Sequence, residues 1–312
     1  MTAPLALEDF VQYAETYEPF PWEISDDHKF QAADIKGKHS VLINLVRFWR
    51  IVSALREIVP AFRTVVDVGP FPGSMIKILH HYFPRDFKYW AVGLGLSKDY
   101  CRAMESLGGS CFETELDPEF VDAAPSHTWP MHDVDCVLLL DVIEHLTNPI
   151  HCLDSINRSL CAGGVLILTT DNLTSFANVY QMARRGHSPN IHPVRSSLFY
   201  RGEWRPHFRE FSADELRFFL EYSGFSVKRH EYFERKQGDF YLDGDGRAHD
   251  RGRYRGIKGM VQKAILLAEP HLMDHQIIIA TKTLEADDMA ARRPRPTKST
   301  AEWMEMRARL GL

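Results

Sequence analysis

The sequence lacks an excess of positive charge. Its 37 lysines and arginines are outnumbered by 42 aspartates and glutamates, which gives a formal net charge of −5. Nucleic acids and acidic membrane surfaces are bound mainly by basic protein surfaces, because their phosphates attract positive side chains. The composition therefore argues against wholesale binding of either, and we expect no nucleic-acid partner.

Cysteine is also scarce, and its spacing argues against two kinds of site. The chain has five cysteines, and no two of them stand in a Cys-x-x-Cys motif. This pattern favours neither a zinc knuckle nor a disulfide scaffold. We therefore expect reduced thiols in a cytoplasmic protein.

No apolar run is both long and uncharged. The longest apolar segment, residues 41–59, contains Arg47, Arg50, Arg56 and Glu57. Charged side chains at those depths are costly in lipid, so we expect a buried or partner-facing helix instead of a membrane span. The first residues show no basic stretch followed by an apolar one, and we expect no secretory signal.

Strand-like and helical patterns alternate through the middle of the 312-residue chain, whose length suits one large domain or two small ones. The unbroken apolar run 134–140 is typical of a central parallel strand covered on both faces. The expected strands cover residues 64–68, 88–94, 110–114, 134–140 and 165–170, and the expected helices cover 74–83, 98–107 and 149–160. This alternation predicts a doubly wound parallel α/β sheet.

The alternation pauses after Thr170 and then resumes. Ser212 and Glu215 form a capping-box pattern, which predicts a helix that continues to Tyr222. The other segments expected here are a helix over 173–184, an irregular stretch over 185–206, a strand over 225–233, a loop over 236–255, a helix over 258–268 and a strand over 276–282.

A glycine-containing loop lies between the first expected strand and helix. Gly69 allows a sharp turn after Asp67, and Gly73 stands at the helix start, where free N–H groups favour negative charge. This pattern is typical of a ligand-binding loop, and equally of an ordinary strand-to-helix turn. The GxGxxG spacing is absent, which argues against a dinucleotide site.

A second cluster of polar residues follows the central strand. Asp141, Glu144 and His145 stand at i, i+3 and i+4, which share one face if a helical turn begins there. Ligands bind at the carboxyl ends of strands in open α/β sheets. The cluster could hold a divalent ion or place a histidine base beside a carboxylate, and it could equally be structural.

Four stretches of the chain carry a resemblance to a known family, and they are residues 65–73, 141–146, 160–172 and 207–216. Their sequences and their order resemble a class I S-adenosylmethionine-dependent methyltransferase, of the small-molecule type found in ubiquinone, sugar and natural-product pathways. The resemblance implies a Rossmann-like, mostly parallel seven-stranded sheet. It also implies a helical N-terminal cap over 1–60, a methyltransferase domain over 61–283 with a lid insert at about 173–211, and a tail over 284–312.

The same resemblance implies S-adenosylmethionine as the cofactor. Residues assigned to it are the loop residues Asp67, Gly69, Pro70 and Gly73, the strand-end residues Gly95, Ser97 and Asp141, and Glu115, which matches an acid that meets the adenine amine.

Two positions depart from the family pattern. Phe71, between two prolines, replaces the usual middle glycine of the loop. Gly95 stands where most relatives carry an acid that accepts both ribose hydroxyls. Losing such a charge-assisted hydrogen bond costs about 1.5–3 kcal/mol, unless Ser97 or Asp99 takes its place.

Histidine is the natural proton acceptor at neutral pH, and the candidates for a catalytic base are His145, His192 and His207. Glu144 joins them as a catalytic candidate. Asp141, Glu144 and His145 are also similar to the Glu-x-x-Glu-His metal site of the ubiquinone-pathway O-methyltransferases, which would take Mg²⁺ or another divalent ion. The Glu-His-Leu sequence is also common in methyltransferases that need no metal.

The insert has a local excess of arginine. Arg184, Arg185, Arg195, Arg201 and Arg205 stand against a single acid, Glu203. This excess favours an anionic acceptor, although a solvated lid or a subunit contact in a homodimer would use the same charges.

Together these features predict methylation of a small molecule, at oxygen, on a saccharide or specialised metabolite. An N- or C-methyltransferase is the first alternative, and a non-catalytic cofactor-binding or scaffold protein is the second. The glycine at position 95 favours the scaffold alternative, whereas the Asp67–Gly73 loop and the Asp141–His145 cluster oppose it.

Overall fold

The computed structural model describes residues 5–24, 40–59, 61–117, 129–186, 207–234, 240–242, 247–250 and 256–292. His192, the insert residues Arg195, Arg201, Glu203 and Arg205, and tail residues 293–312 lie outside these ranges. The predictions made for them therefore stay predictions.

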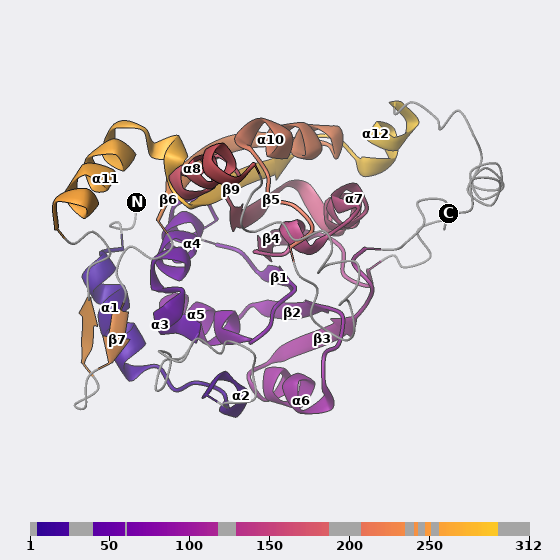
Figure 1. The fold of residues 1–312 in the computed structure, drawn as a ribbon. Coiled ribbons are helices and arrows are strands. Elements are labelled where there is room, and N and C mark those ends of the chain that lie inside the picture. The colour runs from indigo at the N-terminus through magenta and orange to yellow at the C-terminus, as the bar shows by residue number, and fades with distance from the viewer. Residues whose placement is uncertain are drawn as a thin grey trace, which may run out of the picture.

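A seven-stranded sheet forms the centre of the molecule, in the order β3-β2-β1-β4-β5-β9-β6 (Figure 1). The strands are β1 (Thr64–Val68), β2 (Lys88–Gly93), β3 (Gly109–Glu113), β4 (Val134–Leu140), β5 (Leu160–Asp171), β6 (Phe225–Phe233) and β9 (His275–Lys282). Neighbours from β3 through β5 are parallel, and β9 runs antiparallel to both β5 and β6. The expected Rossmann-like, mostly parallel sheet is confirmed.

Helices cover both faces of the sheet because successive strand residues point to opposite faces. Val65 belongs to one buried cluster and Val66 to the other. The first cluster includes residues of α1 (Leu7–Thr16), α4 (Leu45–Ile58), α5 (Ser74–Tyr82) and α6 (Lys98–Ser106). The second includes residues of α7 (Pro149–Ser159) and α10 (Ala213–Tyr222), which Figure 1 draws on the other side of β4.

Several element boundaries differ from those expected. The helix expected over 41–59 is interrupted at Asn44, whose side chain donates to Ser40 O at 3.0 Å, and it divides into α3 (Ser40–Ile43) and α4. Helix α8 (Phe176–Arg185) starts late because Ser175 caps it. The loop expected over 236–255 contains a hairpin of β7 (Phe240–Leu242) and β8 (Ala248–Asp250).

The C-terminal part returns to the sheet after α11 (Gly256–Ala268) and a short turn over Pro270–Leu272. Helix α12 (Ala286–Arg292) then packs beside α7, where Ala286 N donates to Asn157 Oδ1 at 2.9 Å. The Ser212–Glu215 capping box forms as expected. Over the ranges that the structure describes, no helix has the length and apolar character of a transmembrane span.

Candidate functional site

The loop between β1 and α5 lies at the carboxyl edge of the sheet. Gly69 and Gly73 adopt left-handed φ angles of 65° and 96°, which favour glycine. A Cβ atom on Gly69 would lie 2.5 Å from Val142 Cγ2, closer than any packed carbon. Gly69 N also donates to Val92 O at 2.8 Å, which holds the loop against β2. Buried Pro70 follows, and the ring of Phe71 is half exposed.

Asp67 is buried beneath this loop. Tyr89 Oη donates to its Oδ2 at 2.6 Å, and the side chain is 2% exposed. Burial raises the pKa of the Asp67 carboxyl from 3.8 to about 7, against the opposing effects of the Tyr89 hydrogen bond and the Arg47 charge.

Replacing Asp67 with asparagine tests this burial through the pH dependence of stability. The folded chain keeps a proton on Asp67 that the unfolded chain loses near pH 4, so this group lowers the free energy of unfolding as pH rises from about 4 to about 7. Relative to Asp67→Asn, the wild type should lose on the order of 2–4 kcal/mol across that range. Denaturant titrations at each pH measure the difference. The control Asp99→Asn removes an exposed carboxylate and should leave the pH dependence of stability as in the wild type. If the difference in unfolding free energy between wild type and Asp67→Asn did not change with pH, the burial effect would be contradicted.

The ends of β2 and β3 carry the next group of predicted cofactor residues. Gly95 N donates to Glu113 Oε1 at 3.2 Å. Ser97 Oγ caps helix α6 by accepting from Tyr100 N at 3.2 Å. Glu115 Oε1 accepts from Asp117 N at 2.9 Å, so its carboxylate turns back on its own loop.

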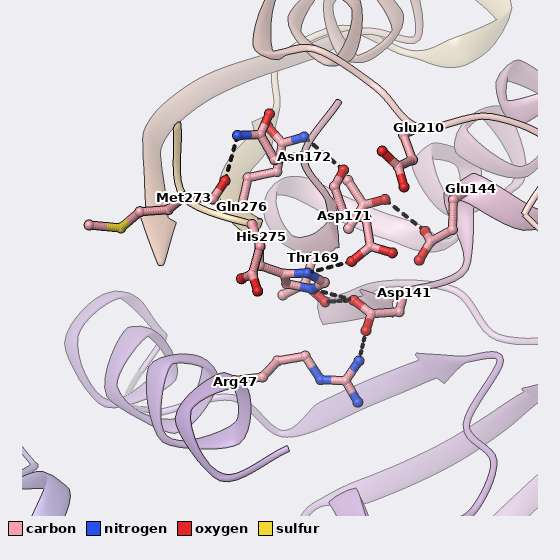
Figure 2. A network of polar contacts seen from close by, with 12 residues as sticks. Arg47, Asp141, Glu144, Thr169, Asp171, Asn172, Glu210, Met273, His275 and Gln276 are labelled. Carbon is pink, nitrogen blue, oxygen red and sulfur yellow. Dashed lines mark hydrogen bonds and ion pairs between the residues drawn. The ribbon is translucent and has the colours of Figure 1, made fainter. Parts of the chain in front are cut away.

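Asp141 lies at the end of β4 in a network of polar contacts (Figure 2). It adopts a left-handed φ of 55° and pairs with Arg47 of α4. Its Oδ1 accepts from Thr169 Oγ1 at 2.8 Å and from His275 Nε2 at 2.8 Å. The opposite nitrogen of His275 lies 3.0 Å from Asp171 Oδ1, so the buried ring bridges carboxylates at the ends of β4 and β5.

The expectation that Asp141 shares a helical face with Glu144 and His145 is wrong. The helical turn covers only Ile143–His145, and Asp141 precedes it with a left-handed backbone. Glu144 and His145 instead gather with His207, with ligand atoms all within 4.8 Å of one another. The Asp141 carboxylate instead pairs with Arg47.

His207 joins the site from the segment that leads into α10. Its Nδ1 lies 3.4 Å from Asp171 Oδ2, and its ring stands edge-on to His145 at 4.6 Å between centroids. The next residue anchors the segment, because Phe208 N donates to Glu144 O at 2.8 Å. The arrangement is a histidine beside a fixed carboxylate, a geometry suited to removing a proton.

Glu144 is buried in the same group. Thr170 Oγ1 donates to its Oε2 at 2.8 Å. Burial, and then the nearby charge of Asp171, raise the pKa of the Glu144 carboxyl to about 7. A second group that could hold a cation, Asp171, His207 and Glu210, shares His207 with the first.

Sequence reasoning did not assign several of these residues. Arg47 entered the sequence analysis only as a charge that argues against a membrane span. Asp171 and Glu210 lay within the stretches that resemble the family, without a role of their own. His275 and Glu113 had no assigned role. A usable signal existed for Asp171, which follows an apolar strand as Asp141 does.

The model of the family described as "Methyltransferase domain" matches residues 41–230, more than half of the chain. No curated protein sequence matches.

Among solved structures, a SAM-dependent methyltransferase from Archaeoglobus fulgidus is 17% identical, with a TM-score of 0.43, and the match covers 75% of this chain and 94% of that one. An S-adenosylmethionine-dependent methyltransferase from Mesorhizobium loti is 14% identical, with a TM-score of 0.46, and the match covers 75% of this chain and 97% of that one. A putative methyltransferase from Bacillus halodurans is 14% identical, with a TM-score of 0.44 and coverages of 77% and 99%.

The family match confirms the resemblance drawn from the sequence motifs. The chain belongs to the methyltransferase-domain family and is a class I S-adenosylmethionine-dependent methyltransferase.

Proposed function

We propose that this enzyme methylates a hydroxyl oxygen of a small molecule, with His207 as the general base. The observation that carries the proposal is the Asp171–His207 pair at the carboxyl edge of the sheet, 3.4 Å apart. A carboxylate that faces Nδ1 fixes the ring and its tautomer, so that Nε2 accepts the proton of the acceptor hydroxyl.

The residues at this edge fit S-adenosylmethionine, the expected cofactor. Gly69 and Gly73 both adopt left-handed φ angles and pack closely, since a Cβ atom would lie 2.5 Å from Val142 on Gly69 and 2.9 Å from Met104 on Gly73, so the loop keeps its tight turn only with glycine at both positions. We assign the loop residues Asp67, Gly69, Pro70 and Gly73, together with Glu115 and Asp141, to the cofactor site. The cofactor supplies a methyl group on a positively charged sulfur.

The protein's own contribution is alignment and proton removal. Methyl transfer is an in-line displacement, so a fixed acceptor oxygen close to a base accounts for much of the rate. His275 supports this by holding Asp171, with its Nδ1 3.0 Å from Asp171 Oδ1. On its other nitrogen, His275 contacts Asp141, whose negative charge is balanced by Arg47.

The acceptor class that we propose is a saccharide or specialised metabolite, as the sequence resemblance implies. Arg184 and Arg185 stand in the last turn of α8, at the start of the arginine-rich insert. Their charges support an acceptor that carries a phosphate or carboxylate.

An isotopically labelled methyl donor tests the proposal. The enzyme should move the label from S-adenosylmethionine to hydroxylated metabolites in a screening panel, and the chemical shift of the transferred carbon identifies the atom methylated. A label on oxygen supports the proposal. A label on nitrogen or carbon would support the alternative methyltransferase class.

A divalent metal is the second candidate for activating the acceptor hydroxyl. Glu144, His145 and His207 offer a carboxylate and two imidazoles whose ligand atoms lie within 4.8 Å of one another. Imidazole donors suit zinc or iron better than Mg²⁺. A metal there would act as a Lewis acid toward the acceptor oxygen.

Removal of metal separates the two candidates. If His207 acts as the base, turnover after dialysis against a chelator should stay within about twofold of the untreated enzyme, since a base needs no metal. Metal analysis of the dialysed protein provides the control. Activity that disappears and returns with zinc or iron would make His207 a ligand instead of a base.

A further inference from the structure

The tip of β2 has no side chain that can accept a hydrogen bond from a sugar. Gly95 follows the last residue of the strand by two positions, with a left-handed φ of 71°. In nucleotide-binding α/β folds, an acidic side chain near this part of the sheet accepts from the ribose hydroxyls. A glycine here leaves that function to another residue.

Glu113 brings a carboxylate to the same place from the neighbouring strand. It is the last residue of β3 and stands opposite Gly93 in the parallel register. Its Oε1 accepts from Gly95 N at 3.2 Å. The Glu113 side chain is exposed at the edge where the cofactor loop also lies. Each carboxylate oxygen has two acceptor sites, so this bond leaves acceptor capacity for a ligand.

Other polar side chains near Gly95 that could accept from the ribose hydroxyls already have other assignments. Ser97 Oγ caps α6 through Tyr100 N. Asp99 pairs with Arg102 in the next turn of the helix, at 3.5 Å. Glu115, which accepts from Asp117 N, is already assigned to the adenine amine of the cofactor by the sequence resemblance.

The backbone around Glu113 is fixed on both sides. Thr114 N donates to Gly93 O at 2.8 Å and continues the pairing of β3 with β2. Asp117 accepts from the backbone N of Thr147 and Asn148, each at 2.7 Å, which ties the segment to the start of α7. The Glu113 carboxylate is therefore presented from a rigid strand end, as a binding group requires.

We infer that Glu113 accepts the hydrogen bonds of the cofactor's ribose hydroxyls, in place of the acid that is absent at Gly95. A carboxylate accepts two neighbouring hydroxyls through its two oxygens, and such charge-assisted bonds are the stronger kind. The inference rests on the proposed cofactor site and adds its sugar-recognising residue.

Binding calorimetry with S-adenosylhomocysteine tests the inference without turnover. Glu113→Gln should weaken binding by roughly 10- to 100-fold, because the neutral amide accepts more weakly and with only one oxygen. An analogue that lacks both ribose hydroxyls should bind the wild type more weakly by a similar factor. The same analogue should distinguish little between wild type and Glu113→Gln, since the two changes remove one interaction.

Asp99→Asn is the matched control, as an acid near Gly95 that should leave the affinity unchanged. Equal affinities for wild type and Glu113→Gln would overturn the inference while leaving the proposed function intact. A Glu113→Gln defect that persists in full with the hydroxyl-free analogue would also overturn it. Failure of the wild type to bind S-adenosylhomocysteine at all would overturn the proposed cofactor site itself.

Discussion

Replacing His207 with alanine is expected to lower kcat by roughly 10²- to 10⁴-fold, the usual contribution of a positioned general base. The affinity for S-adenosylmethionine should stay within about threefold, because His207 lies with Asp171 and His145 and not at the glycine loop. Initial rates with the labelled donor measure kcat, and calorimetry measures the affinity. A loss confined to kcat would mark His207 as acting on the acceptor.

Two variants refine this result. Asp171→Asn keeps the size of the side chain but removes the charge that fixes the His207 ring, so it should also lower kcat. His271→Ala removes a half-exposed histidine whose ring pairs with Glu269, and it should leave the rate unchanged. Full turnover by His207→Ala would contradict the proposed base and return the assignment to His145.

A methyl group on Gly69 is expected to have the second large effect. The added Cβ atom would lie 2.5 Å from Val142 Cγ2, and the φ of 65° strains any residue that has a Cβ. The loop must shift, so Gly69→Ala should weaken S-adenosylmethionine binding by at least roughly tenfold and destabilise the fold by about 1–3 kcal/mol. Calorimetry and thermal denaturation measure the two effects.

Gly108 offers a matched control for the backbone strain. Its φ is 79°, and nothing lies within 4 Å of the position that a Cβ atom would occupy. Gly108→Ala should therefore destabilise the fold by about 1 kcal/mol and leave cofactor binding unchanged. Equal binding by Gly69→Ala and Gly108→Ala would argue against a cofactor at the β1–α5 loop.

The sheet was largely predictable because its strands carry continuous apolar runs. Residues 134–140 form β4 as expected, and 64–68 form β1. The errors occurred where side-chain hydrogen bonds decide the backbone. Asn44 bonds to Ser40 O and interrupts a helix whose apolar spacing continues through it. The spacing of apolar residues alone could not predict that interruption.

The candidate site was predictable only in part. Its strand-end residues follow local motifs, so Gly69 and Asp141 could be found in the sequence. Their partners could not, because Arg47 and His275 stand 94 and 134 positions from Asp141 and meet it only through the tertiary fold. The error over Asp141 has the same origin. The side chain of Asp141 contacts Arg47 and His275, which the helical spacing between Asp141 and Glu144 could not indicate.

Calorimetric titration of the wild-type protein with S-adenosylmethionine is the decisive test of the proposed cofactor site. The proposed cofactor site lies at the carboxyl ends of β1 and β2, on the same edge of the sheet as the Asp171–His207 pair. We expect saturable binding of one cofactor per chain, weakened in Gly69→Ala and retained in His207→Ala. Absence of binding at millimolar cofactor, or binding that Gly69→Ala leaves unchanged, would contradict it.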